Sequence, residues 1–467
     1  MQNRSRSTRF TLGLALILSS LACKRFNDPQ SQTSSEDLAK LPQTNTLMPS
    51  SLSGPGARLV PIDIQEARYQ ISFDIPHHKA EGTAQLTFVM QEGGYPILLF
   101  RNAPQSLTLD GEAQALGLWQ EFSPDPKAES FAFIKKNLAR GEHTLTIAFE
   151  VHTPFLQWDQ GGLQLMTIGS DIRELGQKPD PMVSGFLEKY VPSNYEWDQF
   201  PSHYTFVLQG ASHDHKVMSN ASVALDAQGQ WHVDTPASFN SSALWIHILD
   251  PKHFAVREGS ISGLSRSLAF TLYAPISRAE DLPRAEDILR ATLARLEANL
   301  GPFPHSRYIA GLHGPSEESM EYVGGAYSDL GTLDHEIAHS YFGRGVMPAK
   351  GRDGWLDEAL ATWVLYPAWP AGSLESLKGT VGSASPYDSL TDSQAYTVGP
   401  SLMAYLNSLR KDQGGLMPLL RRFAEANVGR TIAWESFRDF VIADTPDIQK
   451  DLVNAAFGRA IESPSTP

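Results

Sequence analysis

A short segment in the second half of the chain has the residue types and the spacing of a metal-dependent hydrolytic site. His335 and His339 are four residues apart, so on a helix capped by Thr332 and running through Tyr341 both imidazoles would project from one face and could bind one ion. Glu336 lies beside them without having to be a ligand. Its carboxylate could accept a proton from a water molecule that the metal activates, which is the usual general-base role in this motif.

A third metal ligand is expected from a second apolar segment. A catalytic zinc needs three protein ligands and an open fourth position, so two histidines require one carboxylate from elsewhere. Glu358 follows His339 after 18 intervening residues, in a segment predicted to be helical from about Leu356 to Tyr366. The alternative is a chance match on an amphipathic helix whose two histidines lie in the core. The fixed spacing to Glu358 favours the metal site, and we expect one Zn²⁺ per chain.

The sequence around this site resembles that of the aminopeptidase N-like family of gluzincin metallopeptidases. The resemblance includes the ligand spacing, the phrase His-Ser-Tyr-Phe-Gly at 339–343 and the phrase Trp-Leu-Asp-Glu-Ala-Leu-Ala-Thr-Trp at 355–363. In that family a Gly-x-Met-Glu-Asn segment precedes the zinc helix, and its Glu binds the free amino terminus of the substrate. Here residues 318–322, Glu-Ser-Met-Glu-Tyr, occupy that place. The resemblance implies this role for Glu321, and a structural acid on an edge strand is the alternative.

Two more residues receive roles from the resemblance. The segment at 393–403 is similar to the Tyr-x-Lys-Gly segment of the family, whose Tyr donates a hydrogen bond to the oxyanion, and this implies the same role for Tyr396. Val398 stands where the family has Lys, and a tyrosine that packs its ring in the core is the alternative. The family also places an acidic or amide residue of its β domain near the substrate amino terminus. Glu188 is the candidate here, with a solvated surface acid as the alternative.

The beginning of the chain predicts export. Three arginines within the first nine residues precede an apolar run at 10–22, which is too short to span a bilayer and is typical of a signal peptide at 1–22. The tetrapeptide Ser-Leu-Ala-Cys at 20–23 resembles a bacterial lipoprotein cleavage box. Cys23 is the only cysteine, so the chain can form no internal disulfide. We expect Cys23 to be lipidated and to anchor the protein to a membrane, facing the periplasm or the cell surface; a secretory signal with an incidental Cys is the alternative.

The remaining patterns predict an α+β multidomain protein. Residues 24 to about 56 are rich in Ser, Gln, Thr, Pro and Asn, which predicts a disordered tether. The lipidated Cys23 and this tether together form the expected segment 23–56. Short alternating segments at 57–257 predict an N-terminal β-sandwich domain. Helical periodicity then predicts a mainly helical domain at 258–410 and a short C-terminal helical segment at 411–467. The family resemblance implies that residues 258–410 form a thermolysin-like zinc catalytic domain. Larger family members carry a long helical domain over the active site, so the resemblance implies a more open cleft here.

Charge and motif content narrow the expected function. The net charge of −14 argues against nucleic acid as a partner. The metal-site motif predicts a zinc-dependent hydrolase, and the family resemblance implies a metallopeptidase, most specifically an aminopeptidase acting on peptide substrates. Two alternatives stay open, namely a zinc endopeptidase or other small-substrate hydrolase, and a non-catalytic surface lipoprotein that keeps the fold as a binding module. The presence of both Glu336 and Tyr396 favours an enzyme.

Overall fold

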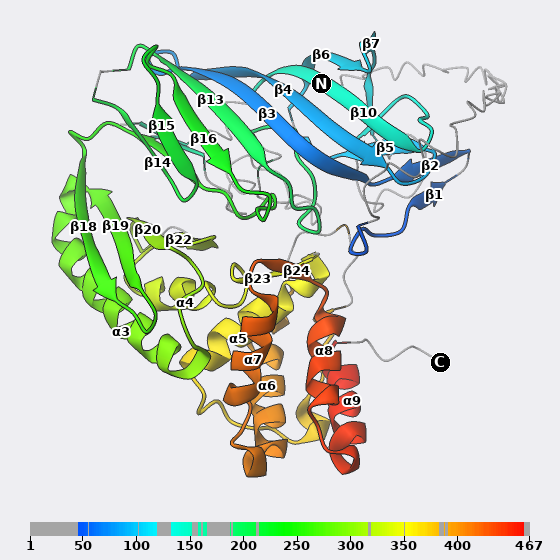
Figure 1. Cartoon of the computed structure of the whole chain (residues 1–467), viewed down its shortest axis with the longest axis vertical. Helices are drawn as coiled ribbons and strands as arrows, with labels where there is room; N and C mark the ends of the chain where they lie inside the picture. Colours follow the sequence, from blue (N-terminus) through cyan, green and yellow to red (C-terminus); the bar gives the residue numbers. More distant parts are fainter. Residues whose placement is uncertain are drawn as a thin grey trace, which may run out of the picture.

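The computed structural model of the chain describes residues 45–461, except for 55, 101, 119–131, 152–156, 160–161, 166–186, 188–189, 212–213, 316–318, 350, 383–386 and 388–390. The segment predicted to be a signal peptide, Cys23 and Glu188 lie outside these residues. Figure 1 shows the strands of the first half gathered in the upper part of the molecule and the helices of the second half below them. The multidomain α+β architecture is the one that the sequence predicts.

The largest sheet belongs to the N-terminal part. It has eight strands in the order β15-β16-β13-β3-β4-β10-β6-β7. Its strands are β3 (Ile62–Asp74), β4 (Lys79–Met90), β6 (Pro104–Leu109), β7 (Glu112–Ala113), β10 (Gly141–Glu150), β13 (Ser202–Gln209), β15 (Ser222–Leu225) and β16 (Trp231–Thr235). Buried side chains alternate with more exposed ones along β10 and β13, because successive side chains of a strand point to opposite faces and one face covers the core.

Two smaller sheets complete the sandwich. One has the order β1-β2-β5-β9-β8 and the other β11-β12-β17-β14. Their strands are β1 (Leu52–Gly54), β2 (Ala57–Val60), β5 (Tyr95–Leu98), β8 (Leu116–Leu118), β9 (Ala132–Ile134), β11 (Gln157–Asp159), β12 (Gly162–Leu165), β14 (Lys216–Ser219) and β17 (Ile246–Leu249). Phe73, Phe88 and Ile147 of the large sheet share one buried cluster with Leu98 of β5 and Ile248 of β17.

Part of the segment predicted to be a disordered tether is ordered. β1 pairs antiparallel with β2, and Leu47 and Met48 pack against a buried cluster that contains Trp197 and Tyr387. The Tyr387 hydroxyl donates to the backbone oxygen of Ser50 at 2.8 Å. The prediction of disorder is therefore wrong for residues 45–54. The prediction failed because composition shows that the segment has few apolar side chains but does not show the distant residues that bury them.

The second part of the chain begins with a five-stranded sheet and a long helix. The sheet has the order β18-β19-β20-β22-β21, with strands β18 (Phe254–Ser262), β19 (Ser267–Pro275), β20 (Arg307–Leu312), β21 (Met320–Tyr322) and β22 (Gly325–Ser328). The boundary predicted after residue 257 falls inside β18. α3 (Leu282–Leu300) buries Leu289, Leu293 and Leu296 in the core that it shares with β19 and β20, as the leucine spacing predicts.

The described residues that follow form six α-helices, namely α4 (Leu333–Ala338), α5 (Trp355–Leu365), α6 (Val398–Leu409), α7 (Met417–Asn427), α8 (Trp434–Ala443) and α9 (Asp447–Ile461). They also form the parallel pair β23 (Val346–Pro348) and β24 (Arg430–Ile432). Side chains of α4 to α9 belong to one buried cluster. The predicted C-terminal helical segment therefore shares its core with the helices that carry the candidate ligands. Within the described residues, no helix combines the length and apolar character that crossing a membrane requires.

Candidate functional site

The first two candidate ligands lie on and just after α4. Leu333 and Ile337 are fully buried on one side of this helix, so His335 and His339 are directed to another side. The helix ends earlier than predicted: it stops at Ala338, and His339 is its C-cap. The predicted side-chain cap by Thr332 is also absent. The hydroxyl of Thr332 instead donates to Oδ1 of Asp329 at 3.2 Å, and the same oxygen accepts from the Thr332 N–H at 3.0 Å.

A tight loop after α4 fixes the imidazole of His339. Its Nδ1 lies 3.2 Å from the backbone oxygen of Phe342. Because a carbonyl oxygen only accepts, Nδ1 carries the proton and Nε2 keeps a lone pair for a metal. The next residue, Gly343, has φ 112°, and a Cβ there would lie 2.9 Å from Nδ1 of His339. A glycine is therefore required for the loop to approach the imidazole this closely.

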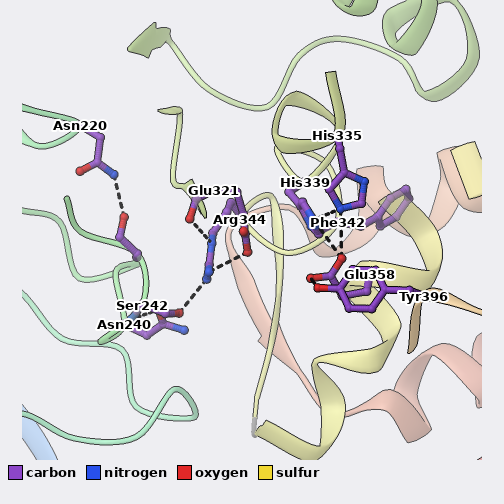
Figure 2. A network of polar contacts seen from close by, with 11 residues as sticks. Asn220, Asn240, Ser242, Glu321, His335, His339, Phe342, Arg344, Glu358 and Tyr396 are labelled. Atoms are coloured by element: carbon purple, nitrogen blue, oxygen red, sulfur yellow. Dashed lines mark hydrogen bonds and ion pairs between the residues drawn. The ribbon is translucent and has the colours of Figure 1, made fainter. Parts of the chain in front are cut away.

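α5 brings the third candidate ligand to the two imidazoles, as Figure 2 shows. Oε2 of Glu358 lies 3.1 Å from Nε2 of His335 and 3.4 Å from Nε2 of His339. The two Nε2 atoms are 3.1 Å apart. A tetrahedral Zn²⁺ with bonds of about 2.0–2.2 Å holds its ligand atoms about 3.3–3.6 Å apart. The three side chains therefore fit one ion of this size after small adjustments.

The electrostatic setting suits these groups to a cation site. Burial by itself raises the pKa of Glu358, but the charge of His339 and the hydrogen bonds from both imidazoles outweigh burial and hold the pKa of this carboxyl below its ordinary value. Burial by itself lowers the pKa of His339, whereas the negative charges of Glu321 and Glu358 raise it well above the ordinary range. The imidazole of His339 therefore lies in an environment that stabilises positive charge.

Glu336 lies beside the cluster in a different environment. It is buried, and this burial, followed by the negative charge of Glu321, raises its pKa well above the ordinary range. One ligand atom from each of Glu321, Glu336 and His339 lies within 4.8 Å of the other two. A carboxylate with a raised pKa next to a candidate metal position can accept and return a proton.

Close packing of α5 against α6 places Tyr396 at the site. A Cβ on Gly399 of α6 would lie 2.6 Å from Cβ of Ala359 in α5, so the glycine permits the two helices to approach closely. Tyr396 ends the 3₁₀ helix Ser393–Tyr396 directly before α6. Its hydroxyl donates to Oε1 of Glu358 at 2.7 Å, and desolvation, followed by the charge of Glu358, raises the pKa of this hydroxyl. The residue as a whole is 46% exposed, so Tyr396 is not a core tyrosine.

The structure also places Glu321 near the cluster, on the edge strand β21, but with a partner that the sequence did not indicate. Nη2 of Arg344 donates to Oε1 of Glu321 at 2.8 Å. Both side chains are buried. Arg344 lies five residues after His339, and no spacing rule for metal sites points to it. Sequence reasoning missed this residue because its importance depends on a strand 23 positions earlier.

Comparison with known proteins gives matches in structure and none in sequence. No protein-family model and no curated protein sequence matches the chain. An M1 zinc metallopeptidase from Deinococcus radiodurans is 13% identical with a TM-score of 0.59, over 89% of this chain and 96% of that chain. A variant of such an enzyme from the same organism, bound to the substrate Tyr-Ser-Ala, is 15% identical with a TM-score of 0.56, over the same shares of the two chains.

A second group of similar structures comes from yeast. Leukotriene A4 hydrolase from Saccharomyces cerevisiae is 14% identical with a TM-score of 0.60, over 87% of this chain and 68% of that chain. A β-rich N-terminal part followed by a helical part with a converging His-His-Glu cluster is thus the architecture of this chain. Its fold is that of the M1 zinc metallopeptidases.

Proposed function

We propose that this protein is a zinc-dependent metallopeptidase that removes amino-terminal residues from peptides. The observation that carries the proposal is the convergence of His335, His339 and Glu358, with Glu336 and Tyr396 beside them. A binding module would need neither a buried proton acceptor nor a hydroxyl donor next to a metal position. The fold shared with M1 zinc metallopeptidases supports the same class of chemistry.

The residues present fit Zn²⁺ as the cofactor, one ion per chain. Nε2 of His335, Nε2 of His339 and the Glu358 carboxylate would hold it, which is the two-histidine, one-glutamate donor set of many catalytic zinc sites. When bound, zinc supplies a Lewis acid that polarises a carbonyl group and makes a nearby water more acidic.

The protein side chains then handle the protons. The carboxylate of Glu336 accepts a proton from the attacking water and returns it to the leaving amine. Its raised pKa supports this assignment, because a carboxyl group takes up and returns a proton most efficiently when its pKa lies near the working pH. The hydroxyl of Tyr396, which donates to Glu358 in the resting site, donates to the oxyanion that develops on the substrate carbonyl.

The aminopeptidase part of the proposal rests on Glu321. Its carboxylate lies within 4.8 Å of candidate ligand atoms of Glu336 and His339, where it can accept a charge-assisted hydrogen bond from a substrate α-ammonium. Peptides as substrates are supported by the M1 zinc metallopeptidase that binds Tyr-Ser-Ala. Glu188, the weaker candidate from the β domain, lies outside the described residues.

The direct test compares matched peptides with free and acetylated amino termini, using the zinc-loaded protein with and without a chelator. We expect hydrolysis of the free peptide, poor hydrolysis of the acetylated one, and loss of both with the chelator. Equal internal cleavage of acetylated peptides would replace the aminopeptidase assignment with that of an endopeptidase. Zinc binding without turnover of any peptide would favour the non-catalytic module.

We further propose that the protein is exported and anchored to a membrane through a lipidated Cys23, with the catalytic part facing the periplasm or the cell surface. The support is the charged and apolar pattern of residues 1–22 and the single cysteine that follows. We expect wild type to fractionate with membranes and Cys23→Ser to become soluble or to remain an uncleaved precursor. Stable attachment requires more than one acyl chain, so we expect several on the mature protein. Finding unmodified Cys23 in the mature protein by mass spectrometry would contradict the proposal.

A further inference from the structure

We infer that Arg344 is a positioning residue, which holds the carboxylate of Glu321 in the orientation that receives the α-ammonium of a peptide substrate. This inference rests on the proposed aminopeptidase function. It assigns a role to a side chain that neither binds the metal nor touches the reacting atoms.

The guanidinium of Arg344 fixes Glu321 at two points. Nη2 donates to Oε1 of the Glu321 side chain at 2.8 Å, and Nε donates to the Glu321 backbone oxygen at 3.2 Å. The exposed fractions of the two side chains are 3% and 9%. Because Arg344 donates to Oε1, we expect Oε2 to be the oxygen that accepts from a ligand.

Glu321 needs such support because of where its strand lies. β21 is the last strand of its sheet, and within that sheet it pairs only with β22. A short edge strand constrains the direction of a long side chain weakly. The Glu321 carboxylate also lies near that of Glu336, and like charges in a buried site repel. The charge of Arg344 offsets this repulsion.

The β domain holds the other side of the guanidinium, as Figure 2 shows. Nη1 of Arg344 donates to Oγ of Ser242 at 2.7 Å, and this hydroxyl donates to Oδ1 of Asn240 at 3.1 Å. Asn240 in turn donates to the backbone oxygen of Glu196 at 3.0 Å. A planar guanidinium with partners on both sides is held rigidly, so the β domain contributes to the orientation of Glu321 through this chain of contacts.

Arg344 is also joined to the candidate metal site through its backbone. Its N–H donates to the backbone oxygen of His339 at 2.8 Å. The loop that fixes the imidazole of His339 therefore ends at the residue that fixes Glu321. This arrangement sets the distance between the metal position, where the scissile carbonyl would lie, and the position of the substrate amino terminus.

A double-mutant cycle tests the inference. Arg344→Met, Glu321→Gln and the double variant are compared on a peptide with a free amino terminus, after metal analysis shows that each retains zinc. We expect each single change to lower kcat/KM about ten-fold or more, mainly by raising KM. The double variant should be no worse than Glu321→Gln, because a residue that acts through Glu321 has nothing left to position. Arg344→Lys, which keeps the charge with fewer directed donors, should lie between Arg344→Met and wild type.

Arg410 provides the matched control. Its side chain is 4% exposed and pairs with the 38% exposed side chain of Asp444, so Arg410→Met removes a similarly buried arginine and its ion pair away from the site. It should lower thermal stability and leave KM unchanged. If Arg344→Met does not fold, Ser242→Ala should raise KM less strongly, and only while Glu321 is present.

Three outcomes would overturn the inference: losses that multiply in the double variant, equal effects of Arg344→Met and Arg410→Met on KM, or a lower KM in Arg344→Met. A lower KM in Arg344→Met would mean that Arg344 competes with the substrate ammonium for the carboxylate of Glu321. A failure of the proposed function is distinguishable, because wild type would then cleave free and acetylated peptides alike before any variant is compared.

Discussion

Glu336 and Glu358 are side chains of the same type in opposite electrostatic settings. Burial and the neighbouring negative charge of Glu321 raise the pKa of Glu336, whereas two imidazoles hold the pKa of Glu358 below its ordinary value despite burial. One carboxyl is thereby suited to exchange a proton and the other to remain ionised as a ligand. The division of roles follows from what each side chain contacts.

This difference predicts separable effects of substitution. Glu336→Gln should keep zinc bound and lower turnover by about 10²-fold or more, because only the proton acceptor is lost. His339→Ala and Glu358→Gln should lower bound zinc, because a three-ligand site loses most of its affinity with one ligand. Metal analysis and peptide hydrolysis on the same samples measure both. Full zinc occupancy in His339→Ala would show that the ligand assignment is wrong.

Asp63 and Asp198 form a buried carboxyl pair in the β domain, and this pair predicts a pH dependence of stability. Burial, followed by the charge of Asp63, raises the pKa of Asp198 well above its ordinary value, and burial raises that of Asp63. Oδ2 of Asp198 accepts from the Ile64 N–H at 2.9 Å and from Asn194 at 2.6 Å. A raised pKa means that the folded state binds more protons than the unfolded state, so this contribution is complete below the ordinary pKa and is lost as the pH rises.

Asp198→Asn should therefore reduce the fall in Tm between about pH 5 and pH 9, because an amide keeps the acceptor oxygen without a titrating proton. Thermal unfolding followed by circular dichroism over this range measures the effect. Parallel Tm curves for wild type and Asp198→Asn would mean that the pair does not govern this dependence.

At the scale of elements, glycines determine how closely segments approach the site. Gly399 allows α6 to pack against α5, and Gly343 allows the loop after α4 to contact the imidazole of His339. Gly229, in the β domain, also has a positive φ of 80°, but a Cβ there would have no atom within 4 Å. A substituted side chain would strain the backbone at both positive-φ positions, but only at Gly343 would it also be crowded.

Gly343→Ala should therefore lower both stability and zinc affinity, the latter about ten-fold or more, because it displaces the imidazole from the Phe342 oxygen. Gly229→Ala should cost only about 1–2 kcal/mol of folding free energy from its left-handed backbone. Zinc titration and thermal unfolding of both variants make the comparison. Equal zinc affinity in the two variants would show that the loop does not orient His339.

At the scale of the whole molecule, the two parts are joined by contacts that lie far apart in sequence. Asn220 donates to the backbone oxygens of Ala243 and Val323 at 2.7 and 2.9 Å, which ties the loop after β21 to the β domain. Residues 45–54 add a further contact through Tyr387. The candidate site therefore depends on the sandwich as well as on its own helices.

Truncation tests how much the N-terminal segment stabilises this arrangement. A chain beginning at residue 45 serves as the reference. One beginning at residue 57 should lose roughly 2 kcal/mol or more, because Leu47, Met48 and Leu52 no longer bury apolar surface against the shared cluster. Thermal unfolding of both chains measures the difference in Tm. Identical Tm values would show that residues 45–56 do not contribute to folding stability.

The sequence alone predicted the multidomain α+β class and the positions that the structure brings together at the candidate centre. Helical periodicity places His335 and His339 on one side, and a fixed spacing to a second helix singles out Glu358; both are local or nearly local signals. The resemblance to a known family pointed to Tyr396 and Glu321.

Only the tertiary structure decided the partners of these residues. The early end of α4 depends on the loop that folds back onto His339, and the order of residues 45–54 depends on Trp197 and Tyr387. The contacts of Arg344 with Glu321 and Ser242 join positions 23 and 102 residues away. Periodicity carries no information about such pairs, because packing between distant segments determines which buried charges meet.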